Sequence, residues 1–518
     1  MSDLSKIFES DVSQWLRPGG VVESLCGHRR FRCGVINPRT AKDVQRIVWA
    51  ASRARGAVKL QPFSCGNNWG FGSALAPRHA VYSLDLSQLS TIRSINLLGH
   101  YAEIEPGVTQ QSLDEALQSR GGTHYFNVTG AGLRASVIGN ALERGIGYFG
   151  QRHLDLLDLE VVLPSGDLVR TSRFDAHSRS AYAGGLGPDP TGLFCQSSFG
   201  VITGATIALH RRCEVMGGIV CRLHDGDRLP ALLTAISNLV AEGACHGVPH
   251  IFNRERILTT FLPHLGAPEA SRLKSTVGPW SAVIPVRGSR SVFVASAQYF
   301  AEALTPLGQV EIIDNDKESN LSSLLRGRPS DFALASIAFN VFGRRAPLNA
   351  HVEATGAGLI HLAPVLPLTS DAILEVQGLT EKIVRRHGYG VVPLSLNVLS
   401  PRAAVLVVSI GFDRRSASAT EAARLAAADL LRAYVRAGFL PYRLGLEQGN
   451  LVPVMERPWR RILQAMRHTL DPFGCMGDSR YEQLWEADRT KPLPRINGRQ
   501  RSQEERKTCK SSTESELP

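Results

Sequence analysis

The hydrophobic residues of the first 210 positions follow helical spacing in places and strand patterns repeatedly. Val44, Ile47, Val48 and Ala51 recur at the spacing of one helix face, which predicts an amphipathic helix over residues 40–55. Short apolar or alternating runs predict strands at residues 57–61, 81–86, 101–105, 156–163, 167–171 and 200–209, and a second helix is expected over residues 111–118. This half of the chain is therefore expected to be rich in short strands.

The pattern changes after about residue 213. Strands are expected at residues 219–223, 391–399 and 403–412, and helices at 228–242, 372–386, 420–437 and 459–470. A strand that leads into a helix is expected within residues 291–304. Single helices that alternate with strands are typical of an antiparallel sheet covered by helices on one face. With 518 residues the chain is too long for one ordinary core, so we expect an α+β protein of two domains.

The composition agrees with a folded protein and excludes several classes. Hydrophobic residues make up 43% of the chain and charged residues 20%, and no run of 18 apolar residues predicts a membrane span. The nine cysteines form no C-x-x-C pair and no cluster with histidine, so neither a zinc site nor a disulfide framework is expected. The N-terminus lacks the pattern of a secretory signal, and we expect a cytoplasmic location.

The basic residues outnumber the acidic ones by 58 to 47, which gives a net charge of +11. Such an excess suits an anionic ligand or nucleic acid, but solubility alone is the alternative explanation. No module of basic and aromatic residues typical of nucleic-acid binding accompanies the charge. Neither nucleic acid nor a membrane is therefore an expected partner.

The segment SCGNNWGFG at residues 64–72 is the most distinctive loop. Its glycines permit positive φ and the close approach of another group, and successive N–H groups in such a loop form a concave site for an anion such as pyrophosphate. The segment is neither a Walker loop nor a G-x-G-x-x-G motif, because the required lysine and glycine spacings are missing. From these residues alone, a plain structural turn remains the alternative.

Seven segments, in the same order along the chain, resemble the vanillyl-alcohol oxidase and p-cresol methylhydroxylase flavoproteins. They are SCGNNWGFGSA (64–74), YAEIEPGVT (101–109), SVIGNALERGIGY (136–148), DLEVVLPSGDLVRT (158–171), TGLFCQSSFGVITGATI (191–207), LPYR (440–443) and LDPFGCMGDSRY (470–481). Because these segments extend from the N-terminal half almost to the C-terminus, the resemblance is far more specific than any single motif.

The resemblance implies an α+β, two-domain FAD-binding fold of the p-cresol methylhydroxylase type with an inserted antiparallel-sheet cap domain. The implied FAD-binding domain covers residues 28–212, the substrate-binding cap covers 213–440, and a C-terminal segment at 441–496 completes the first domain before a disordered tail at 497–518. FAD is the implied cofactor, and no metal is expected. The resemblance further implies a small-molecule substrate and either oxygen or a redox protein as electron acceptor, and it leaves a homodimer open.

In the family, the loop corresponding to residues 64–72 wraps the cofactor pyrophosphate, and the later segments hold the rest of FAD. Matched position by position, the implied cofactor-binding residues are Gly66, Asn67, Asn68, Gly70, Gly72, Ser136, Gly139, Asn140, Gly145, Gly147, Gly200, Ile202 and Arg480. The position of the flavin-linking histidine falls nearest Leu359. His361 would be the covalent ligand only after a small gap, and non-covalent FAD is the alternative.

Family members that oxidise phenols bind the substrate phenolate with two tyrosines and an arginine. Tyr442 and Arg443 match one such pair, and an arginine stays charged and lowers the pKa of a neighbouring phenol. Two positions depart from the family pattern: Phe71 replaces the second tyrosine, and Ala131 replaces an acidic residue that some oxidases place near the flavin. His153 is a further candidate as a proton carrier, with a structural histidine as the alternative.

Together these residues imply an FAD-dependent oxidoreductase. It would take a hydride from a C–H bond of an aromatic or phenolic alcohol or alkyl substrate onto flavin N5. Phe71 and Ala131 indicate a substrate other than the usual para-alkylphenol. The alternative is a flavin-binding subunit that has lost catalysis, which the same two replacements favour.

Overall fold

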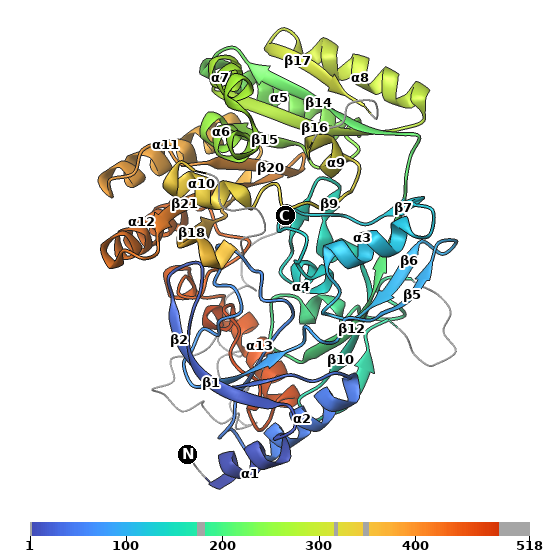
Figure 1. The fold of residues 1–518 in the computed structure, drawn as a ribbon, viewed down its shortest axis with the longest axis vertical. Coiled ribbons are helices and arrows are strands. Elements are labelled where there is room, and N and C mark those ends of the chain that lie inside the picture. The colour runs from blue at the N-terminus through green and yellow to red at the C-terminus, as the bar shows by residue number, and fades with distance from the viewer. Residues whose placement is uncertain (1–2, 173–181, 315–319, 345–351, 486–518) are drawn as a thin grey trace, which may run out of the picture.

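The computed structural model describes residues 3–172, 182–314, 320–344 and 352–485. Figure 1 shows two smaller sheets in the half of the molecule that contains the N-terminus and one large sheet in the other half. The disorder expected for residues 497–518 falls outside the described residues.

The N-terminal half contains a four-stranded sheet with the order β1-β2-β4-β3 and a five-stranded antiparallel sheet with the order β11-β10-β12-β6-β5. In the four-stranded sheet, β1 and β2 form an antiparallel hairpin, whereas β4 runs parallel to both of its neighbours. The strands are β1 (Leu16–Glu23), β2 (Arg29–Ile36), β3 (Leu60–Phe63), β4 (Val81–Asp85), β5 (Ile92–Asn96), β6 (Tyr101–Ile104), β10 (Leu156–Val162), β11 (Leu168–Arg170) and β12 (Val201–Ala208).

Helix α2 (Ala41–Arg53) confirms the predicted amphipathic helix. Thr40 begins it with a capping box: the Thr40 hydroxyl accepts from the Asp43 N–H, and the Asp43 carboxylate accepts from the Thr40 N–H. The apolar face of α2 packs in one core with residues of both N-terminal sheets. The other short elements of this half are α1 (Asp3–Asp11), α3 (Gln110–Gln118), α4 (Val137–Leu142), β7 (His124–Tyr125), β8 (Ile146–Gly147), β9 (Gly150–Gln151) and β13 (His210–Arg211).

The large sheet has eight strands, which pair only in antiparallel fashion; seven follow the order β17-β14-β16-β15-β20-β21-β18, and β19 pairs with β21. Its strands are β14 (Val215–Leu223), β15 (His250–Asn253), β16 (Trp280–Gly288), β17 (Gly308–Ile313), β18 (Ala357–Leu362), β19 (Val365–Pro367), β20 (Leu394–Ser400) and β21 (Ala403–Asp413). The accompanying helices are α5 (Leu229–Ala241), α6 (Arg254–Phe261), α7 (Ala267–Thr276), α8 (Arg290–Leu304), α9 (Asn320–Leu325), α10 (Ala335–Phe342), α11 (Ser370–Arg386) and α12 (Ala417–Arg436). The expected antiparallel sheet is confirmed.

The two faces of the large sheet differ in chemistry. Side chains alternate between the faces of a strand, so Leu394 and Leu396 of β20 pack in the core formed with α5, α8, α11 and α12. Ser395 and Asn397 each follow one of these leucines in sequence. They point to the opposite face and border a cavity. The same alternation in β14, β15, β16 and β21 gives the sheet one apolar face and one face that is open to a ligand.

Strands β1, β2 and β5 were not expected from the sequence. β1 contains Pro18 and two glycines, and β2 carries three arginines, so neither shows a clean hydrophobic alternation. The β1–β2 hairpin pairs through its backbone and keeps many of its side chains exposed or half-buried. A strand held mainly by backbone hydrogen bonds leaves little signal in the hydrophobic pattern.

The described C-terminal residues, from α13 (Arg457–Leu470) onward, lie in the N-terminal half (Figure 1). The Leu60 N–H donates to the Cys475 carbonyl at 2.8 Å, and the Gly477 N–H donates to the Leu60 carbonyl at 2.6 Å. This contact agrees with a first domain that is completed from the C-terminal end, while the boundaries at residues 212 and 440 stay predictions. No described helix combines the length and the apolar character that crossing a membrane requires.

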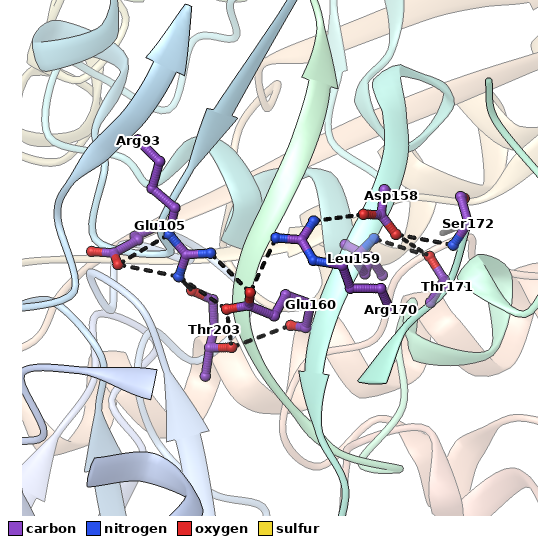
Figure 2. Close-up of polar contacts among 9 residues, drawn as sticks. All are labelled: Arg93, Glu105, Asp158, Leu159, Glu160, Arg170, Thr171, Ser172 and Thr203. Carbon is purple, nitrogen blue, oxygen red and sulfur yellow. Dashed lines mark hydrogen bonds and ion pairs between the residues drawn. The ribbon is translucent and has the colours of Figure 1, made fainter. Parts of the chain in front are cut away.

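A network of ion pairs crosses the five-stranded sheet (Figure 2). Arg93 of β5 binds both carboxylate oxygens of Glu160, at 2.9 and 3.0 Å, and also lies 3.2 Å from Glu105. Arg170 of β11 binds Glu160 at 3.1 Å and Asp158 at 2.7 Å. Burial alone would raise the pKa of the Glu160 carboxyl, but the hydrogen bonds and charge of Arg93 hold it below its usual value. Glu160 thus joins strands from both edges of the sheet.

Replacing Glu160 by alanine should lower the free energy of unfolding by about 2 kcal/mol, because both arginines lose a shared carboxylate in a partly buried site. The stabilisation by Glu160 should be complete above about pH 4.5 and should disappear as the pH falls through its lower folded pKa. Urea unfolding across this pH range measures both effects. As a control, Arg385→Ala breaks an exposed pair with Glu381 and should change stability little. An equal loss in both variants would contradict the expectation.

Candidate active site

A large cavity lies between the N-terminal sheets and the open face of the large sheet. Its volume is about 740 Å³, within the range of sites that enclose drug-sized ligands. Three parts of the chain form its wall: segments between residues 61 and 202, the open face of the large sheet with helices and loops between residues 256 and 340, and residues 442–443 with 479–481. Segments far apart in the sequence therefore meet at one site.

The loop at residues 64–72 forms part of this wall, as expected. Gly66 has a φ of 71°, in the left-handed region that favours glycine, and an added Cβ would lie 3.0 Å from the Cβ of Ala74. Asn67 and Asn68 border the cavity next to Gly66. The bend is held by a hydrogen bond of 3.1 Å from the Ser73 N–H to the Asn68 carbonyl.

A second part of the wall surrounds the start of α4. The Ser136 hydroxyl accepts from the Gly139 N–H at 2.9 Å and donates to the Pro106 carbonyl at 2.6 Å. A Cβ added to Gly139 would lie 2.3 Å from Ser64 Oγ, so this position brings α4 against the loop at 64–72. The other implied cofactor residues that border the cavity are Asn140, Gly145, Gly200, Ile202 and Arg480.

Three of the implied cofactor residues do not border this cavity, whose wall is defined here by the described residues. They are Gly70, Gly72 and Gly147. A Cβ on Gly72 would lie 2.4 Å from Leu446 Cγ, and one on Gly147 would lie 2.1 Å from the Val128 carbonyl oxygen. These glycines allow neighbouring segments to pack closely. The sequence resemblance could not distinguish a glycine needed for close packing from a glycine that contacts the cofactor.

Tyr442 and Arg443, the pair for which a substrate role is predicted, both border the cavity. The Arg443 side chain donates a hydrogen bond of 2.6 Å to Asn68 Oδ1, and its guanidinium carbon lies 4.4 Å from the centre of the Phe71 ring. Its Nε lies 3.8 Å from a Glu143 oxygen. Burial alone would lower the pKa of Arg443, but Tyr442 and Glu143 hold it above its usual value, so the guanidinium stays charged.

Tyr481 and Glu143 complete this cluster and were not singled out from the sequence. The Tyr481 hydroxyl donates to Glu143 at 2.8 Å and accepts from the Gln196 side chain at 3.1 Å. Burial and the Glu143 carboxylate raise the pKa of Tyr481 well above its usual value, so its phenol is neutral. Tyr481 follows Arg480 in the segment at 470–481, so its place beside a predicted residue was the available signal.

The chemistry of the wall suits FAD. Gln61 Oε1, Ser73 Oγ and Asn140 Oδ1 are buried in residues that border the cavity and have no hydrogen-bond partner among the described residues. Buried polar atoms usually have partners, so their gathering here fits a ligand rich in polar groups. The glycine-rich bend beside them offers backbone donors for a pyrophosphate.

Comparison with known proteins shows which flavoproteins this chain is similar to. The FAD binding domain family matches residues 33–172. The chain is 26% identical to 1'-carboxy-chondrochloren decarboxylase of Chondromyces crocatus, over 86% of this chain and 90% of that protein. It is 21% identical to the 4-cresol dehydrogenase [hydroxylating] flavoprotein subunit of Pseudomonas putida, over 86% and 87% of the two chains.

Solved structures agree with these sequence matches. The structure of p-cresol methylhydroxylase with substrate bound matches with a TM-score of 0.80 and 18% identity, over 95% of this chain and 97% of that one. The structure of 4-ethylphenol oxidase from Gulosibacter chungangensis matches with a TM-score of 0.78 and 21% identity, over 94% and 95%. Over most of its length the chain is therefore similar in sequence and fold to FAD-linked oxidoreductases of the vanillyl-alcohol oxidase and p-cresol methylhydroxylase type. Its expected cofactor, FAD, is thereby confirmed.

In this flavoprotein both His361 and Leu359 of β18 border the cavity. The backbone N–H of His361 donates to the Gly70 carbonyl at 2.9 Å. A Cβ added to Gly70 would lie 2.2 Å from the imidazole ring of His361, so glycine at position 70 makes room for the ring. His361 Nδ1 lies 3.0 Å from Ser409 Oγ. Burial, followed by the charge of Arg256, lowers the pKa of His361 to about 3, so the ring is neutral.

The two other positions named from the sequence lie in different surroundings. Ala131 borders the cavity, and its carbonyl accepts a hydrogen bond of 3.1 Å from the Trp69 indole. His153 lies in the short helical turn Arg152–Asp155 and is not part of the described cavity wall. Burial lowers the pKa of His153, and its Nδ1 has no partner among the described residues. The structure therefore does not place His153 on the described cavity wall that Tyr442 and Arg443 share, and we propose no role for it in the reaction.

Replacing Gly66 by valine should weaken FAD binding at least about tenfold, because a β-branched residue is strained at positive φ and crowds Ala74. Flavin content after purification, followed by titration with FAD, measures the effect. Gly121→Val is the matched control, since Gly121 has a φ of 89°, has no atom within 4 Å of an added Cβ and does not border the cavity. Equal flavin loss in both variants would point to general misfolding instead.

Proposed function

We propose that this flavoprotein oxidises a phenolic or other aromatic alcohol or alkyl substrate, which gives up a hydride from a C–H bond to flavin N5. Bound FAD supplies the acceptor for this pair of electrons. The observation that carries the proposal is the buried, charged Arg443 beside Tyr442 on the wall of a cavity that fits FAD.

Arg443 would bind the substrate oxygen. A permanent positive charge in a buried site lowers the pKa of a bound phenol and stabilises the phenolate. The extra electron density then favours loss of a hydride from the carbon attached to the ring. Arg443 Nε has no hydrogen-bond partner among the described residues, although Asn68 and the face of Phe71 fix the guanidinium from two sides.

Phe71 changes how the substrate would be held. A tyrosine hydroxyl at this position would donate one more hydrogen bond to a phenolate, a contribution of about 1–3 kcal/mol for a charged acceptor. Phe71 instead stacks against Arg443. Ala131 supplies no carboxylate on its side of the cavity. Both replacements favour a substrate other than a simple para-alkylphenol.

A second candidate reaction is the loss of a carboxyl group from the substrate during oxidation. One relative is named as a decarboxylase of a carboxy compound. The cavity wall carries four arginines, Arg222, Arg256, Arg443 and Arg480, but only two glutamates, Glu143 and Glu311, so its charge favours an anionic substrate. Oxygen and a redox protein are both retained as electron acceptors, because relatives are named oxidase and dehydrogenase.

Anaerobic reduction of the purified protein tests the proposal. The protein should be yellow, with flavin absorbance at about 450 nm. A phenol or aromatic alcohol from a substrate panel should reduce the flavin and so bleach this absorbance. In Arg443→Ala, reduction should slow by about 100-fold or more, because a buried charge-assisted contact is lost, while FAD content changes far less.

Two outcomes would contradict the proposal. If the protein takes up no FAD, the proposed cofactor is wrong. If dithionite reduces the bound flavin but no compound of the panel does, the alternative of a non-catalytic flavin-binding subunit is favoured. Arg443→Lys separates charge from geometry, since lysine keeps the charge but loses the planar fork. If Arg443→Ala loses flavin while the rate per flavin is unchanged, Arg443 supports the cofactor and not the substrate.

We further propose His361 as the covalent ligand of the flavin, because its neutral ring borders the cavity and neutral imidazole is the nucleophilic form. After acid precipitation the yellow colour should stay with the wild-type pellet and should leave the His361→Ala pellet. Ser409→Ala is the control, because it removes the hydroxyl beside Nδ1 but keeps the imidazole. A colourless wild-type pellet would establish non-covalent FAD instead.

A further inference from the structure

Arg256 is a half-buried cation with an incomplete set of partners. It lies on α6, borders the cavity, and donates a hydrogen bond of 2.5 Å from Nη2 to Ser409 Oγ on β21. Its Nε is buried without a hydrogen-bond partner among the described residues. Burial lowers the pKa of Arg256 to about 10, and no carboxylate counteracts this effect. At neutral pH the protein therefore keeps a charged guanidinium inside without an anion.

The other arginines of the cavity wall have acidic neighbours. Arg222 pairs with Glu311 at 2.8 Å, and Arg443 and Arg480 lie 3.8 and 3.9 Å from Glu143. Within the described ranges, Arg256 takes part in no ion pair. An unpaired charge in the interior is costly, so a site that keeps one usually provides it for a ligand.

The part of the cavity wall that includes Arg256 and its partner Ser409 suits a small anionic group. Ser281, Ser395, Asn397 and Ser409 point from the open face of the large sheet into the same cavity. They alternate with residues that pack in the core beneath the sheet, so their direction is fixed by the strand pleat. Hydroxyl and amide donors beside a guanidinium are the groups that bind a carboxylate.

We propose that Arg256, with these side chains of the open sheet face, binds a carboxylate of the substrate. The inference deepens the proposed function: Arg443 and Tyr442 would hold the phenolic end, and Arg256 the acidic end, of an aromatic carboxylic acid. Arg256 lies on α6 beside the open face of the large sheet, whereas the bend at residues 64–72 that we assign to the pyrophosphate belongs to the N-terminal half of the chain. The carboxylate site is therefore assigned to the substrate and not to FAD.

Calorimetric titration of the FAD-loaded protein tests the proposal without turnover. The probes are 4-hydroxyphenylacetate and the uncharged 4-hydroxyphenylacetamide, which have nearly the same shape. Wild-type protein should bind the acid at least about tenfold more tightly than the amide, because only the acid forms a charge-assisted pair with Arg256. Arg256→Gln should remove this preference and leave the affinity for the amide within about threefold.

Arg254→Gln is the matched control. It removes the same charge from the same helix, but Arg254 does not border the cavity and binds the carbonyl oxygens of Lys274 and Val277. It should keep the preference for the acid. Arg256→Lys should keep part of the preference, because it retains the charge without the guanidinium fork.

Results from the wild-type protein and from its variants can each overturn the proposal. A wild-type protein that binds the acid no better than the amide overturns it, even if Arg256→Gln fails to fold. An unchanged preference in Arg256→Gln, or an equal loss in Arg254→Gln, overturns it too. Loss of FAD from Arg256→Gln would assign the residue to the cofactor. Failure of the proposed oxidation appears separately, as binding of the acid with no bleaching of the flavin by any panel compound.

Discussion

The alternation of side chains along the eight-stranded sheet is the constraint on which the site depends. Leu396, Val408 and the other residues on their face of the sheet pack beneath four helices. The residues adjacent to them in sequence must therefore point to the opposite face. Asn397 and Ser409 therefore line a cavity without any local signal that marks them as functional. A one-residue slip in register would reverse the two sets, which is why the apolar core also determines the chemistry of the open face.

The opposite wall of the cavity depends on contacts between distant segments. The exchange of hydrogen bonds between Leu60 and the chain at Cys475–Gly477 holds the C-terminal residues beside the N-terminal sheets. Arg480 follows directly and donates to the Phe71 carbonyl at 3.0 Å. In this way the glycine-rich bend, the Arg443 cluster and the C-terminal segment support one another, and none of them forms the site alone.

The charges of the cavity are divided between its two walls. On one side, Arg443 and Arg480 share the carboxylate of Glu143, which also accepts from the neutral Tyr481. On the other side, Arg256 and the neutral His361 meet at the hydroxyl of Ser409. Since His361 carries no charge at neutral pH and Arg222 is paired with Glu311, Arg256 supplies the unpaired positive charge among the described residues on that side. This arrangement suits an aromatic substrate with polar groups at both ends.

The two-part α+β organisation, helix α2, the glycine-rich bend and the pair Tyr442 and Arg443 could all be predicted from the order of the amino acids. These features depend on local periodicity, on backbone freedom at glycine and on segments whose order along the chain resembles a known family. Only the tertiary structure separated glycines at the cavity, such as Gly66, from those that allow close packing, such as Gly72. It also placed His153 apart from the cavity and brought in Glu143, Tyr481 and Arg256. Contacts between residues hundreds of positions apart follow from how sheets and helices pack, and no short window of sequence contains that information.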